Sequence, residues 1–141
     1  MNTPTWTPLE NDTAAFLDDY DTRGRDENAD QTGSFAPNFL ALDPNRASAL
    51  TPAALAAALP MRRRAFTAAG IGDFTRAGAR QMRLDDRHVL LAIDWEAAHQ
   101  PSPIPVSATF LLRQEDHGYE IALYLNHTDL TAHLNTAGST S

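Results

Sequence analysis

Arg62 is a cation placed within the apolar face of a predicted helix. It follows Leu59 by three residues and precedes Phe66 by four, so the three side chains share one side of that helix. A guanidinium directed into an apolar pocket could bind a carboxylate or an enolate. Alternatively, Arg62 reaches past the core to an acid or to helix carbonyls, or a kink at Pro60 turns it outward. The sequence leaves both roles open.

His127 is the histidine best placed for proton transfer. It ends a predicted strand on the same face as Leu123 and Leu125, which would direct it toward the mouth of a pocket. Imidazole changes charge closer to neutral pH than other unperturbed side chains, so it suits a general acid or base. A structural hydrogen bond to Asp129 is the alternative role.

The composition excludes several kinds of chemistry. Cysteine is absent, which removes disulfides, thiolate ligands and a cysteine nucleophile. All 11 residues counted as lysine or arginine are arginine, so lysine Schiff-base chemistry is also removed. His127, Asp129 and His133 would diverge on a helix rather than converge on one ion, and we expect no metal site. No motif indicates a cofactor.

Charge and hydropathy limit the partners. A net charge of −7 argues against nucleic acid, because nothing would offset phosphate repulsion over an extended surface. No apolar run approaches the roughly 18 residues of a membrane span, so no membrane partner is expected. The N-terminus lacks the basic and apolar segments of a secretory signal, and we therefore expect a cytoplasmic protein.

The length predicts one domain over residues 9–134, with a flexible N-terminus over residues 1–8 and a disordered tail over residues 135–141. A first helix should end near Gly24, which accepts a positive φ. Asp18, Asp19 and Asp21 fall off its apolar stripe and are expected to face water. The stripe comprises Trp6, Leu9, Thr13, Phe16, Leu17 and Tyr20.

A hairpin and a second helix should follow. Asp43 and Pro44 suit the first positions of a type I turn, which would pair Phe39–Leu42 with Ala47–Leu50. The helix is predicted over Thr51–Ala69 from an N-cap threonine and a following proline. Proline at position 60 is expected to kink or divide this helix.

The second half of the chain predicts an antiparallel meander. Three strong strands are expected, and Asp73–Leu84 is a weaker strand before them. Helices followed by such strands indicate an α+β domain with helices packed on one face of a curved sheet. The opposite face is half apolar, which favours a homodimer formed through it. The strong strands are His88–Glu96, Val106–Arg113 and Tyr119–Asn126.

This order of elements resembles the nuclear transport factor 2-like superfamily, which includes SnoaL-like cyclases and ketosteroid isomerases. The resemblance covers nearly the whole chain and implies a cone, in which a curved mixed or antiparallel sheet wraps about three N-terminal helices. The stretches that carry it are Phe16–Tyr20, Phe35–Leu40, Ala49–Pro52, Ala69–Ile71, Leu91–Trp95, Ala108–Arg113, Gly118–Ile121 and Tyr124–His127.

The resemblance also implies roles for two residues. Tyr20 matches the hydroxyl donor of ketosteroid isomerase-like members, and Asp43, followed by Pro44, matches their proton-shuttling base. The second acid that those enzymes carry on a late strand is missing, since Val106–Leu112 contains none. Alternatively, Tyr20 is the polar tip of a core stripe and Asp43 only begins a turn.

The sequence favours a non-catalytic homodimer with a pocket for a small, mostly apolar ligand. A cofactor-independent isomerase, dehydratase or cyclase acting on a small hydrophobic substrate is the first alternative, because catalytic candidates exist: Tyr20, Asp43 and His127. A protein-interaction adaptor is the second. The residues expected to line the pocket are Tyr20, Phe39, Arg62, Phe66, Trp95, Phe110 and His127.

Overall fold

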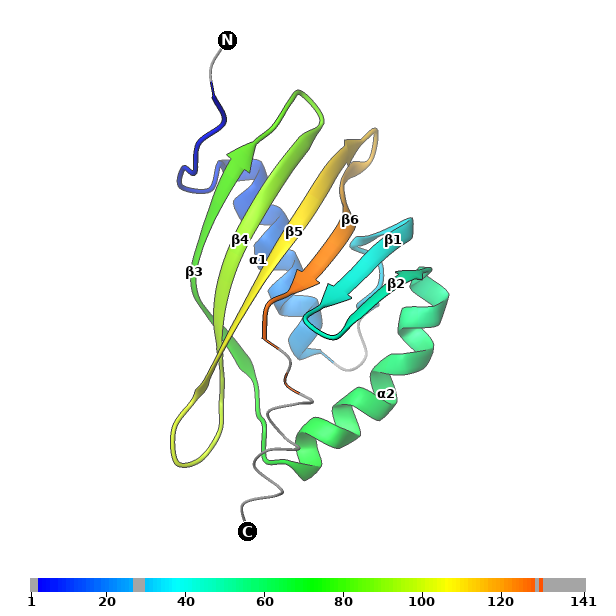
Figure 1. The fold of residues 1–141 in the computed structure, drawn as a ribbon, viewed down its shortest axis with the longest axis vertical. Helices are drawn as coiled ribbons and strands as arrows, with labels where there is room; N and C mark the ends of the chain where they lie inside the picture. Colours follow the sequence, from blue (N-terminus) through cyan, green and yellow to red (C-terminus); the bar gives the residue numbers. More distant parts are fainter. Residues whose placement is uncertain (1–2, 27–29, 129, 131–141) are drawn as a thin grey trace.

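A computed structural model describes residues 3–26, 30–128 and 130 of the 141-residue chain. Its elements form one curved sheet with α1 across one face and α2 beside the β1–β2 hairpin (Figure 1). This arrangement confirms the predicted α+β cone. The helices are α1 (Asn11–Arg25) and α2 (Pro52–Ala68), and the strands are β1 (Phe35–Asp43), β2 (Arg46–Leu50), β3 (Phe74–Arg83), β4 (His88–Ala97), β5 (Ile104–Glu115) and β6 (Gly118–Asn126).

The six strands lie in the order β2-β1-β6-β5-β4-β3. Neighbouring strands are antiparallel except for β1 and β6, which run parallel, so the sheet is mixed. The predicted hairpin is confirmed, with Phe39 opposite Leu50 and Leu42 opposite Ala47. The parallel pairing of β1 with β6 places this hairpin beside the last strand.

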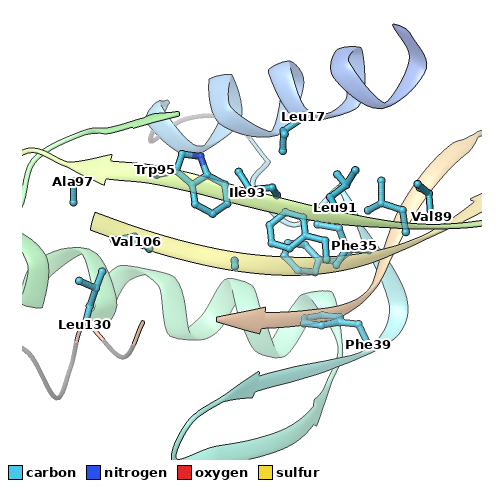
Figure 2. Packing of buried hydrophobic residues seen from close by; sticks show 14 of the residues in the cluster. Leu17, Phe35, Phe39, Val89, Leu91, Ile93, Trp95, Ala97, Val106 and Leu130 are labelled. Atoms are coloured by element: carbon cyan, nitrogen blue, oxygen red, sulfur yellow. The ribbon is translucent and has the colours of Figure 1, made fainter. Parts of the chain in front are cut away.

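The core lies between α1 and the concave face of the sheet. Alternate residues of β4 and β5 face inward, as their periodicity predicts, and each pairs with a buried partner across the strands. Leu17 of α1 packs over this face near Leu91 and Ile93 (Figure 2). The paired inward residues are Val89 and Leu112, Leu91 and Phe110, Ile93 and Ala108, and Trp95 and Val106.

A β-bulge in β6 reverses the faces expected for its second half. Leu112 pairs with Ile121 but Leu111 pairs with Leu123, so Ala122 is an extra residue between them. Beyond it, Tyr124 faces inward opposite Phe110. The prediction that Leu123 and Leu125 face the core is therefore wrong, because the extra residue shifts the alternation by one.

The bulge makes the outer face more apolar than the sequence indicates. Adjacent strands place half-buried or exposed side chains in one row, which we call the outer row. Leu40 is 45% exposed at one end of it. The outer row consists of Leu40, Leu123, Leu111, Leu90 and Met82.

The described residues contain two helices, where about three were expected. Pro60 does not divide α2, which runs without interruption through it. The carbonyl of Ala56, which would accept a bond from residue 60, lies on an exposed turn where water can solvate it. Thr51 and Pro52 begin α2 as predicted, and the Thr51 hydroxyl accepts a hydrogen bond from Ala54 N at 3.2 Å.

The first helix begins later than its apolar stripe suggests. Asn11 is its first residue, so Trp6 and Leu9 precede it, and Trp6 instead lies under the Arg80 guanidinium. Thr7, within the segment expected to be flexible, exchanges two backbone hydrogen bonds with Gln81 of β3. The domain limits stay a prediction, since residues 1–2 and 131–141 lie outside the described part.

Neither helix that the structure describes has the length and apolarity to cross a membrane.

Candidate functional site

A pocket of about 680 Å³ opens at the end of the cone where the helices and the hairpin meet. Its walls come from the C-terminal end of α1, the inward side of the hairpin, one face of α2 and the inward residues of β4 to β6. Most of the lining is aliphatic or aromatic. The lining aromatic residues are Tyr20, Phe35, Phe39, Phe66, Phe74, Trp95 and Tyr124.

Tyr20 is at the centre of the aromatic wall. It comes from α1, and its ring centroid lies 5.2 Å from that of Phe110 and 6.4 Å from that of Trp95. The Phe110 ring stacks at 5.0 Å on Tyr124, which the β6 bulge turns inward. Edge-to-face and offset contacts of this kind stabilise a fixed ring arrangement. The wall is therefore preformed.

Two tyrosines of this wall, Tyr20 and Tyr124, pack against the ring of Phe110. Burial raises the pKa of Tyr20 well above its ordinary value, and the neighbouring Tyr124 raises the pKa further. The Arg62 guanidinium acts in the opposite direction. Tyr20 is therefore a neutral hydroxyl at physiological pH, able to donate a hydrogen bond but not to act as a base.

Asp21 lines the pocket beside Tyr20, although it was expected to face water. Its carboxylate accepts a hydrogen bond from Trp95 Nε1 at 3.0 Å, and Arg76 Nη1 lies 3.4 Å away. Burial raises its pKa, against the lowering by Trp95 and Arg76. The prediction that Asp21 faces water is wrong because the last turns of α1 pack against the sheet. There the sheet also covers Asp21, which is next to the apolar stripe of the helix.

Arg62 projects from α2 into the pocket lining, as one of its two predicted roles requires. Phe66 follows Arg62 by one turn of α2. The guanidinium of Arg62 lies over the Phe66 ring, 5.1 Å from its centroid. No carboxylate forms an ion pair with Arg62 among residues 3–26, 30–128 and 130. Arg62 is exposed, so its guanidinium donors are accessible to water and to a ligand in the pocket.

Asp43 also lines the pocket, but its carboxylate already has partners. One oxygen accepts hydrogen bonds from the backbone N–H groups of Asn45 and Arg46, at 2.7 and 2.8 Å. This is the turn-forming role of an aspartate before a proline. The turn fixes one carboxylate oxygen at the pocket rim.

The strand register corrects the expected position of His127. Its Nε2 lies 2.8 Å from the hydroxyl of Thr109, on the outer face of β5, and His127 is exposed and absent from the pocket lining. The cause is the extra residue Ala122, which turns every later side chain of β6 to the other face. The hydrogen bond expected with Asp129 lies outside the described residues.

Six of the seven residues expected at the pocket are at or under its wall. Tyr20, Phe39, Arg62, Phe66 and Trp95 line it, and Phe110 is fully buried beneath the wall. Their functional roles stay a prediction.

Sequence reasoning missed Asp21 and Tyr124. Asp21 carried a detectable signal, since it directly follows Tyr20 at the covered end of α1. For Tyr124, the strict alternation of β6 predicted an outward side chain.

The described part of the chain contains no group of three or more histidine, aspartate or glutamate side chains arranged to hold a metal ion. Two of the residues weighed as ligands, Asp129 and His133, lie outside it.

Known proteins resemble this chain in structure rather than in sequence. No protein-family model matches the sequence, and no curated protein matches it significantly. An NTF-2-like protein of unknown function from Shewanella oneidensis MR-1 aligns with a TM-score of 0.66 at 12% identity, over 83% of this chain and 97% of that one. An NTF2-like protein of unknown function from Pseudomonas putida KT2440 aligns with a TM-score of 0.65 at 12% identity, over 83% and 84% of the two chains.

A third structure links the fold to a bound small molecule. It is a hypothetical protein from Catenulispora acidiphila with a ketosteroid isomerase-like fold, in complex with trimethylamine. It aligns at 19% identity and a TM-score of 0.53, over 88% of each chain. At these identities the likeness concerns the fold and not the activity. The described residues form a curved six-stranded sheet with two helices and an open-ended pocket, and this chain has the nuclear transport factor 2-like fold.

Proposed function

We propose that this protein is a non-catalytic, homodimeric binding module whose pocket holds a small, mostly apolar ligand. The observation that carries the proposal is the pocket itself, of about 680 Å³ and walled by aromatic rings. Ligand sites in proteins are typically clefts of about 300–1,000 Å³, apolar in the main, with a few convergent polar groups. The hydroxyl of Tyr20, the carboxyl of Asp21 and the guanidinium of Arg62 are such groups here.

Two further observations support this function. The outer row gives the opposite side of the sheet an apolar surface that a second copy could cover. The fold neighbour from Catenulispora acidiphila is described in complex with a small amine, which supports ligand binding as one use of this fold.

The test uses a neutral probe and a variant that fills the pocket. Ser48 of β2 lines the pocket, while the next residue, Ala49, lies opposite Leu40 on the other side of the hairpin. We expect N-phenyl-1-naphthylamine to bind the parent saturably, with one site per chain, and Ser48→Trp to weaken binding at least about tenfold by occupying the space. Fluorescence titration measures both.

Ala49→Trp is the matched control, because it adds the same ring to the same strand on the other face. We expect its affinity to stay within about twofold of the parent. Equal binding to the parent and to Ser48→Trp would show that the probe site is elsewhere, and would remove the proposal.

A second candidate function is a cofactor-independent isomerase, dehydratase or cyclase acting on a small hydrophobic substrate. It is favoured by the presence of Tyr20, Asp21 and Asp43 in the lining of one pocket, with a neutral hydroxyl and a carboxyl of raised pKa among them. In this scheme an Asp43 oxygen removes a proton next to a substrate carbonyl, and Tyr20 donates a hydrogen bond to the enolate. The engagement of Asp43 in its turn favours the non-catalytic function.

Deuterium exchange separates the two functions. A catalyst would speed incorporation of solvent deuterium into the methyl group of 2-acetonaphthone, and Tyr20→Phe would abolish the gain. A rate equal to that of buffer at saturating ketone would count against the enzyme.

A further inference from the structure

The pocket carries a different charge balance from the rest of the molecule. The whole chain has a net charge of −7, yet more arginines than aspartates line the pocket. Two of the acids already have partners. The Asp21 carboxylate accepts a hydrogen bond from Trp95 and lies beside Arg76, and the Asp43 carboxylate accepts hydrogen bonds within its own turn. The charged lining residues are Arg25, Arg46, Arg62, Arg63, Asp21, Asp43 and Asp73.

None of the four arginines that line the pocket forms an ion pair within the described residues, and Arg62 is distinguished by its stack on an aromatic ring. Arg25 acts on the carboxyl of Asp21, and Arg46 lies opposite Asp43 in the hairpin. Arg63 also lines a neighbouring hollow that contains Asp30. For Arg62 the described residues supply an aromatic ring and no paired carboxylate. A guanidinium that lines a pocket and has no ion pair within the described residues is free to bind an anion.

The groups beside Arg62 also suit an anion. Arg62, Tyr20 and Tyr124 all line the pocket, and the positive charge of Arg62 lowers the pKa of Tyr20 against the larger effect of burial. A tyrosine hydroxyl donates to an oxyanion, and the guanidinium edge can bind both oxygens of a carboxylate. The rings of Phe66 and Trp95 remain for the apolar body of the same ligand.

We propose that the ligand is an apolar, ring-containing carboxylate, with Arg62 binding the carboxylate and the Tyr20–Tyr124 pair donating to it. This inference rests on the proposed binding function and specifies its ligand class. The aromatic wall alone would also attract an ammonium group, since ring faces bind cations. The uncompensated charge of Arg62 opposes a cation, so the two ligand classes have opposite responses to its removal.

Three isosteric probes test the inference by isothermal titration calorimetry: 2-naphthoate, the neutral 2-naphthamide and the cation 2-naphthylmethylammonium. We expect the parent to bind 2-naphthoate about tenfold more tightly than the amide, in line with one charge-assisted contact. Arg62→Gln should remove this preference, so that the variant binds 2-naphthoate and 2-naphthamide with equal affinity. The cation should bind most weakly to the parent.

Arg64→Gln is the control, because it removes the same charge from the same helix at a position outside the pocket lining. It should keep the preference for 2-naphthoate. Equal affinities of the parent for acid and amide, or tighter binding of the cation, would overturn the inference and leave an apolar pocket in place. An equal loss in both arginine variants would overturn it as well. Failure of every probe, N-phenyl-1-naphthylamine included, would remove the binding function too.

Discussion

The raised pKa of Asp21 makes stability depend on pH in a defined direction. Burial is the main cause, and the native carboxyl holds its proton to a higher pH than the unfolded one. Between these two pKa values the native state binds more protons, so raising the pH through this window costs stability. The contribution is present at acid pH and is lost as the pH rises above the native pKa.

Asp21→Asn should therefore become more favourable relative to the parent as the pH rises. The amide keeps an acceptor for Trp95 Nε1, which donates to Asp21 at 3.0 Å, and removes the titration. Urea unfolding at several pH values from about 3.5 to 7 measures the difference in unfolding free energy.

Asp19→Asn, on the exposed side of the same helix, shows the effect of losing one negative charge there. A difference between Asp21→Asn and the parent that does not vary with pH would contradict the assignment.

Gln81 joins the segment before α1 to the sheet. Its side chain is 1% exposed; its Oε1 accepts hydrogen bonds from Glu10 N, at 2.9 Å, and from the hydroxyl of Thr13. Its Nε2 donates to a Glu10 carboxylate oxygen at 2.7 Å. Fully satisfied buried networks of this kind fix one arrangement of the chain.

Gln81→Leu should lower the unfolding free energy by about 1–3 kcal/mol, because it leaves the backbone N–H of Glu10 without its acceptor, while the Thr13 hydroxyl keeps the Glu10 carbonyl at 3.0 Å. Gln114→Leu, at an exposed position of β5, should stay within about 0.5 kcal/mol of the parent. Chemical denaturation measures both. Equal effects of the two substitutions would mean that the network contributes little.

Residues on a strong helical or strand period were predictable, and those near an end or a bulge were not. Tyr20, Arg62 and Trp95 reach the pocket wall because their periods hold to the end of each element. Asp21 was assigned to solvent because periodicity describes the helix and not the sheet that covers its last turn.

The β6 bulge is the element that sequence periodicity could not locate. Both faces of this strand are apolar, so shifting the alternation by one residue keeps apolar side chains inside and outside. Only the pairing with β5 shows that Ala122 is extra. Because Ala122 is extra, Tyr124 lines the pocket, and His127, which was expected there, lies on the outer face.

Helix α2 forms a wall of the pocket although it contains no buried residue. Local features help to stabilise it, with Thr51 as the N-cap and Pro52 as the first residue. Thr51→Ala removes the acceptor for Ala54 N and should destabilise the helix by about 1 kcal/mol.

Amide hydrogen exchange measures this prediction for Thr51→Ala residue by residue. Exchange should quicken in the first turns of α2 and stay unchanged in β4, since the helix opens without the sheet. Thr51→Ser keeps the acceptor and should exchange as the parent does. Equal acceleration in α2 and β4 would mean that the two unfold as one unit.

At the scale of the whole molecule, the order of elements was enough to predict the fold. A meander after amphipathic helices can bury its apolar face only by curving around them, and the structural neighbours share this arrangement. The charge balance of the pocket depends on which turn of α2 meets which end of α1, and no local pattern encodes that.

The outer row provides the last prediction, which concerns assembly. Leu40, Leu123 and Leu111 continue one apolar band over three adjacent strands, and Leu40 is 45% exposed. A second copy related by two-fold symmetry can cover this band with the same residues. We therefore expect the parent to sediment at twice the chain mass.

Arginine at two positions of that band should separate the copies, because each copy would bury two unpaired charges in the interface. The double variant Leu40→Arg and Leu123→Arg should sediment as a monomer in analytical ultracentrifugation, while keeping the circular dichroism of the parent. Met61→Arg, at a 70% exposed position on α2, should remain a dimer. A monomeric parent would exclude assembly through the sheet, and a dimeric double variant would move the interface elsewhere. The pocket lies on the inner face of the sheet, away from the outer row. Either result of this experiment therefore leaves the titration test of ligand binding unaffected.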